Sequence, residues 1–205
     1  MTVPYRIPNN RNRFSTPVLA GLTLFVGTAM TIAFWPGVGT WEVIQFALQR
    51  KLPVMNDWKS PFIAGIYWVS DDLFKSTGPI LLLQQILFWS GLALLVEAAF
   101  TRILHQILFF SAIAILPPIW ITGIMLWKEA WTLSLLTLGI GATFAFLQNK
   151  RTIFAVIALL STILLTATRH NAILLAFPTF YVIAQAIVDK ASATQKNQRR
   201  MILIV

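Results

Sequence analysis

GPILLLQQILFWSGLALLVEAAF, residues Gly78–Phe100, is the stretch that decides the fold, because its only charged side chain is Glu97, near its end. A helix needs about 20 consecutive, mostly apolar residues to cross the hydrocarbon core of a bilayer. No polar stripe interrupts the segment, as it would on the surface helix of a soluble domain. The stretch therefore predicts a transmembrane helix.

Further segments of the same kind lie on both sides of this stretch. The chain has 205 residues, of which 57% are apolar and 11% charged, whereas soluble domains are about 25% charged. The sequence predicts an all-α, polytopic transmembrane helical bundle with about six spans. The expected spans are Pro17–Trp35, Gly78–Phe100, Ile103–Leu126 (interrupted by Pro117 and Pro118), Glu129–Leu147, Thr152–Thr166 and Asn171–Val188.

The first loop between spans, residues 36–77, is long and less apolar than the spans. Residues Trp41–Leu48 and Phe62–Phe74 each place apolar side chains along one helical face. Ser60 is a favoured N-cap residue and Pro61 suits the first helical position of the second segment. We expect two amphipathic helices lying in the membrane interface.

The basic residues indicate the orientation. With a cytoplasmic N-terminus and six alternating spans, 10 Lys and Arg residues lie inside and 6 outside, as the positive-inside rule favours. The net charge of +9 is carried by short tracts between apolar segments, so we expect the lipid bilayer and no nucleic acid as a partner. The loop 36–77 is then on the outer face.

Most of the acidic residues and several cations fall on that same outer face. Charge next to hydrocarbon is costly, so charges that converge there indicate a site. A carboxylate can act as a general base, and Lys and Arg bind phosphate. The candidate catalytic residues are Glu42, Asp57 and Glu129, and the candidate phosphate-binding residues are Lys59, Lys128, Arg169, His170 and Asn171.

Each candidate also has a purely structural interpretation. Glu42 and Glu129 could complement helix dipoles from the first turn of a helix, and Lys128 could extend along the interface. Asn171 could cap the last span. The chain has no Cys and only two His residues, so we expect no metal site and no required cofactor; a carboxylate-bound divalent cation stays open.

Short motifs give a resemblance to a known superfamily. Pro36-Gly37 followed by Glu42, then Asp57-Trp58-Lys59-Ser60-Pro61, then Trp127-Lys128-Glu129 and Arg169-His170-Asn171 occur in this order. The pattern resembles the GT-C integral-membrane glycosyltransferases, in particular the polyprenyl-phosphate-sugar-dependent, protein-mannosyltransferase-like members. Relatives usually have Asp where Glu42 and Glu129 stand, and often His at the position of Lys59.

The resemblance implies a GT-C-like core over residues 1–190 in a bacterial inner membrane. The enzyme would transfer a sugar, with inversion, from a polyprenyl-phosphate donor to an acceptor hydroxyl at the outer face. Residues 191–205 form a basic tail, expected as a solvated linker, and the start of a further span, so the chain resembles a truncated member.

Two other functions remain open. The chain could be a non-catalytic or truncated subunit that binds a polyprenyl lipid beside a partner membrane subunit. It could also be a small-molecule transporter, because Pro117-Pro118 and Pro178 fit the discontinuous helices of transporters.

Overall fold

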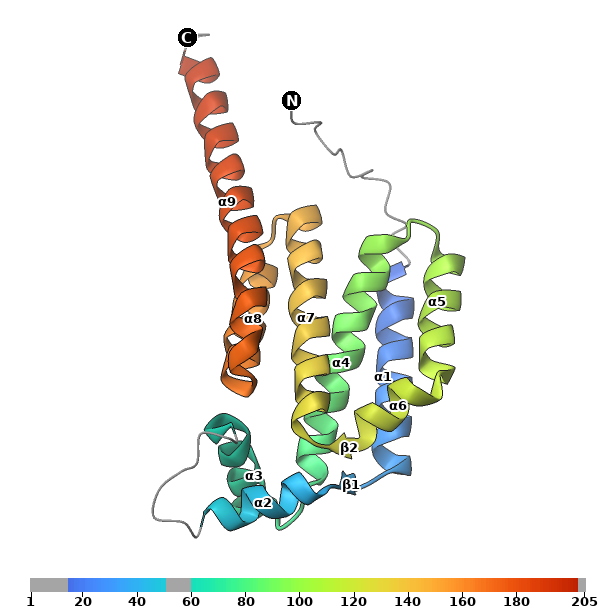
Figure 1. The fold of residues 1–205 in the computed structure, drawn as a ribbon. Coiled ribbons are helices and arrows are strands. Elements are labelled where there is room, and N and C mark those ends of the chain that lie inside the picture. Colours follow the sequence, from blue (N-terminus) through green and yellow to red (C-terminus); the bar gives the residue numbers. More distant parts are fainter. Residues whose placement is uncertain (1–14, 51–59, 203–205) are drawn as a thin grey trace.

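The computed structural model describes residues 15–50 and 60–202. They form an all-α fold of nine α-helices, one short 3-10 helix and a pair of two-residue strands (Figure 1). The predicted all-α class is therefore confirmed.

The helices follow the predicted order. They are α1 (Ser15–Ala33), α2 (Trp41–Gln49), α3 (Pro61–Phe74), α4 (Gly78–Ala99), α5 (Ile103–Ile115), α6 (Pro117–Ile124), α7 (Lys128–Asn149), α8 (Thr152–Thr168) and α9 (Ile173–Ile202). The strands are β1 (Val38–Gly39) and β2 (Met125–Leu126), and the 3-10 helix η1 is His170–Ala172.

The long helices run alternately up and down, and α2, α3 and the strand pair gather at the lower end of the bundle (Figure 1). We call this lower end, where α7 begins and α8 finishes, the α3 end. The helix α1 begins, and α9 finishes, at the opposite end (Figure 1).

Three helical segments of the described residues are long and apolar enough to cross a membrane: α4, α7 and His170–Val188. The helices α5 and α6 could form a fourth span, although they meet at an angle of 64°. Two further apolar segments, Pro17–Ala33 and Thr152–Thr168, are shorter. The coarser prediction, several membrane-length helices, is confirmed, whereas the number six is not.

The break between α5 and α6 lies where the sequence places two prolines. Pro117 is the first residue of α6, and the preceding Leu116 has an extended backbone (φ −67°, ψ 116°). Proline lacks an N–H and disfavours a helical residue before it. The expected interruption of this span is therefore present, as a sharp bend.

The helices α4 and α7 pack together most closely through two glycines. A Cβ atom on Gly141 would lie 2.5 Å from the carbonyl oxygen of Gly91, and one on Gly91 would collide with the backbone of Leu138. Small residues let helix backbones approach in this way in membrane proteins. The α4–α7 pair is the centre to which the other spans attach (Figure 1).

The two helices of the first loop form as predicted. The Ser60 hydroxyl accepts a hydrogen bond from the Ile63 N–H (3.3 Å), and Pro61 opens α3. On α2 the apolar face that we expect to contact the membrane, with Trp41, Ile44 and Leu48, is exposed, whereas Phe46 is buried. The indole of Trp68 donates to the Phe46 carbonyl oxygen (2.8 Å), which holds α3 against α2.

The basic tail differs from the prediction of a solvated linker. The helix α9 continues without a break through the tail to Ile202. The tail has no proline or glycine to end the helix, and its Lys, Arg, Gln and Ala residues have favourable helix propensities.

Candidate functional site

A short parallel strand pair brings the start of α2 to the start of α7. Val38 pairs with Met125 and Gly39 with Leu126. The Thr40 hydroxyl adds a hydrogen bond to the Leu126 carbonyl oxygen (3.2 Å). Gly37 has a positive φ of 103°, and a Cβ there would lie 2.9 Å from the Leu126 side chain. Only glycine fits this approach without strain, so the Pro-Gly motif positions Glu42.

Glu42 reaches from α2 to the first residue of α7. One carboxylate oxygen accepts a hydrogen bond from the backbone N–H of Lys128 (3.0 Å), and the other lies 3.5 Å from the Lys128 ammonium nitrogen. The first N–H groups of a helix have no partner within it, and an anion is favoured beside them. Glu42 therefore caps α7 from a distant part of the chain.

The next residue of α7 makes a second ion pair. Glu129 lies 3.3 Å from the guanidinium of Arg169, which follows the last residue of α8. The α8 end is itself held in place, because the Ser60 hydroxyl donates to the Ala167 carbonyl oxygen (2.7 Å). The starts of α2 and α3 and the α8–α9 turn thus meet around the start of α7.

Glu42 with Lys128 and Glu129 with Arg169 form two ion pairs on adjacent residues of α7, and we call these four residues the charge row. Its side chains are between 27% and 48% exposed, and exposed pairs of this kind contribute only about 0–1 kcal/mol each to stability. The two ion pairs therefore contribute little to the stability of the fold.

The remaining predicted site residues divide into two groups. His170 and Asn171 lie in η1, directly after Arg169, and are exposed. Asp57 and Lys59 lie outside the described residues. Four of the eight candidates are therefore joined by direct contacts, and two more adjoin them in the sequence.

A buried tyrosine lies behind the charge row and was not among the sequence candidates. The Tyr67 side chain is only 5% exposed, and its hydroxyl has no hydrogen-bond partner among the described residues. Burial, with a smaller contribution from the negative charge of Glu42, raises the pKa of Tyr67 above its ordinary value, while the nearby Trp131 indole lowers it. The Trp131 indole nitrogen, which lies near this hydroxyl, likewise has no hydrogen-bond partner among the described residues.

The signal for Tyr67 was present in the sequence. Tyr67 follows Ile63 and Ala64 by four and three residues, so all three share one face of α3. A tyrosine on a buried face usually needs a hydrogen-bond partner for its hydroxyl. The position of Tyr67 on this apolar face is therefore the signal that indicates a polar group in the core.

A separate ion pair connects the far ends of α2 and α3. The Arg50 guanidinium donates two hydrogen bonds to Asp72, at 2.7 and 2.9 Å. These bonds lower the pKa of Asp72 and raise that of Arg50. The pair joins the C-terminal ends of α2 and α3, whereas the charge row lies at the start of α2 and of α7, so we regard the pair as structural.

Within the described ranges, no group of three His, Asp or Glu side chains is placed to hold a metal ion. Comparison with known protein families, with characterised proteins and with solved structures finds no match for this chain. The fold therefore shows only the class of protein: a helical protein with several helices that could cross a membrane.

Proposed function

We propose that the chain is a six-span membrane glycosyltransferase whose charge row lies at the outer face. The donor is a sugar linked to polyprenyl phosphate, and the acceptor is a hydroxyl. The observation that carries the proposal is the convergence of two carboxylates and two cations on the start of α7, from three separate segments. Such a site offers both a proton acceptor and a place for phosphate.

The reaction assigns one role to each charge. The acceptor oxygen attacks the anomeric carbon, and its proton passes to Glu42. The bond from the anomeric carbon to the phosphate oxygen breaks, and its electron pair leaves with polyprenyl phosphate. Lys128 and Arg169 stabilise the departing phosphate, and Glu129 orients Arg169.

The resting contacts of Glu42 leave it able to accept a proton. Each of its carboxylate oxygens makes one contact with Lys128, and each oxygen has two lone pairs. The acceptor hydroxyl can therefore donate to Glu42 while the contacts with Lys128 persist.

The same contacts favour one alternative function. A glutamate that permanently caps α7 needs no catalytic role, and the cations could then serve binding alone. In that case the chain is a non-catalytic membrane subunit that binds a polyprenyl phosphate lipid.

The variant Glu42→Gln separates these two functions. Its amide oxygen can still accept from the Lys128 N–H, but it cannot take up a proton. We would incubate membranes containing the protein with polyprenyl-phosphate mannose or glucose, labelled in the sugar, and measure sugar transfer. Loss of a general base typically costs about 10²–10⁴-fold in rate, so we expect at least a hundredfold decrease.

Asp71→Asn is the matched control, because it removes a carboxylate from an exposed position on α3 without touching the charge row. Transfer by Glu42→Gln at the wild-type rate would exclude the proposed base. No transfer by the wild type, combined with Arg169-dependent binding of the lipid, would establish the binding subunit instead.

A further inference from the structure

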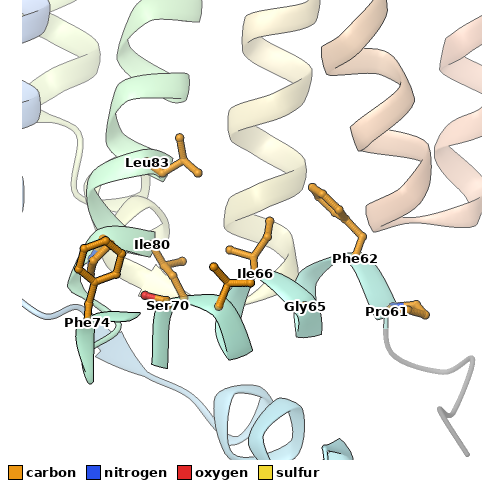
Figure 2. Close-up of a pocket in the computed structure, with 10 residues that line it drawn as sticks. Pro61, Phe62, Gly65, Ile66, Ser70, Phe74, Ile80 and Leu83 are labelled. Carbon is orange, nitrogen blue, oxygen red and sulfur yellow. The ribbon is translucent and has the colours of Figure 1, made fainter. Parts of the chain in front are cut away.

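An apolar groove of about 520 Å³ runs along α3 and the first turns of α4. Its walls include Phe62, Gly65, Ile66, Phe74 and Leu83 (Figure 2). Val69 also lines it. The lining hydroxyl, that of Ser70, already donates to the Ser76 carbonyl oxygen (2.8 Å). The volume lies within the range of about 300–1,000 Å³ typical of small-molecule sites, but the lining suits hydrocarbon.

One end of the groove adjoins the charge row. Phe62 packs edge-on against Trp131, with ring centroids 6.5 Å apart, and Trp131 is in the first turn of α7, after Lys128 and Glu129. Ser60, two residues before Phe62, is bonded to Ala167, close to Arg169. A molecule with an anionic head at the charge row would find an apolar surface leading away from it.

The other end of the groove opens toward the outside of the bundle. Val69, Phe74 and Leu83 are each at least 40% exposed, and α4 is one of the membrane-length helices. A hydrocarbon chain could therefore enter the groove sideways from a bilayer.

We infer that this α3–α4 groove holds the part of a polyprenyl chain nearest the phosphate, while the phosphate contacts Arg169 and Lys128. The inference rests on the proposed function for the identity of the lipid. The groove itself has no charged lining residue, so the anionic head of its occupant must lie beyond one end. Arg169 and Lys128 lie beyond the Phe62 end, and Lys75 follows Phe74 at the other end; only the Phe62 end offers two cations together with the proposed base.

Gly65 provides a direct test of the groove. A Cβ at this position has no atom within 4 Å, so a larger side chain projects into open space. Gly65→Leu should fill part of the groove without disturbing α3, and leucine favours a helix more than glycine does. Gly21→Leu on α1 is the matched control, because its Cβ also meets nothing within 4 Å and Gly21 is not part of the groove.

We would titrate each purified, full-length protein in detergent with polyprenyl phosphate and measure bound lipid by native mass spectrometry. The competing ligands are the corresponding polyprenol, a diacyl phosphatidic acid and inorganic phosphate. We expect Gly65→Leu to weaken polyprenyl phosphate binding at least tenfold and Gly21→Leu to leave it unchanged. We expect Arg169→Ala to abolish the preference for polyprenyl phosphate over polyprenol.

Two results would overturn the inference: undiminished binding by Gly65→Leu, or diacyl phosphatidic acid binding as tightly as polyprenyl phosphate. The latter would make the groove a seat for bulk lipid. The two proposals fail separately. Gly65-dependent binding without any sugar transfer refutes only the glycosyltransferase, whereas Glu42-dependent transfer that is indifferent to Gly65→Leu refutes only the groove.

Discussion

At the scale of single residues, two polar groups at the α3 end differ: the Glu42 carboxylate has partners, whereas the Tyr67 hydroxyl has none among the described residues. Glu42 has partners for both oxygens because α2 and α7 begin side by side. Tyr67 is buried on α3 beside Trp131, yet its hydroxyl finds no acceptor among the described residues. A buried polar group without a hydrogen bond costs about 1–3 kcal/mol.

Replacement of Tyr67 by Phe removes that cost and retains the ring that stacks on Phe46, with centroids 5.2 Å apart. We expect Tyr67→Phe to leave the free energy of unfolding unchanged or to raise it by about 1 kcal/mol. The check is the thermal unfolding midpoint of the purified protein in detergent.

Trp68→Phe is the comparison for this experiment. It removes an indole N–H that does have an acceptor, the Phe46 carbonyl oxygen, so we expect a decrease of about 1 kcal/mol or more. A clear decrease for Tyr67→Phe as well would mean that its hydroxyl is bonded, for instance to an ordered water.

At the scale of elements, the α4–α7 contact depends on the absence of side chains at Gly91 and Gly141. In a bilayer the surrounding lipid is as apolar as the helix surfaces, so close backbone packing is what holds helices together. The other spans pack against this pair, so any increase in the distance between α4 and α7 would affect the whole bundle.

We expect Gly91→Leu to prevent folding or to destabilise the protein severely, because its side chain would meet the Leu138 backbone. Overpacking of a core typically costs about 1–3 kcal/mol, and backbone cannot move aside as a flexible side chain can. The measurement is the fraction of monodisperse protein in size-exclusion chromatography after membrane extraction. Gly21→Leu should behave as wild type, and a monodisperse, equally stable Gly91→Leu protein would contradict the close contact.

At the scale of the molecule, the described spans place the α3 end and the α4–α5 and α7–α8 turns at opposite ends of the bundle (Figure 1). The charge row and the groove both belong to the α3 end. If the proposed orientation is correct, both face the outside of the cell.

Single cysteines can test this arrangement, because the chain has none of its own. We expect Asp71→Cys and His170→Cys to react with a membrane-impermeant maleimide in intact spheroplasts. Thr101→Cys, in the α4–α5 turn, and Thr152→Cys, at the first residue of α8, lie at the opposite end and should react only after permeabilisation. Labelling of all four in intact spheroplasts, or of the opposite pair alone, would refute the six-span arrangement or its orientation.

By itself, the sequence determined the class, the helix order and most helix bounds. Apolar length, proline positions and the Ser60-Pro61 start of α3 act locally, and local rules transfer to structure without knowledge of the fold. The helical tail was missed because polar composition resembles both a linker and an exposed helix.

Only the tertiary structure decided which charges meet. Glu42 and Lys128 are 86 positions apart, and their contact depends on the pairing of β1 with β2 and on the close approach at Gly37. The Tyr67 environment and the α3–α4 groove likewise arise where separate helices pack. Such contacts depend on distances between segments, which composition and periodicity do not encode.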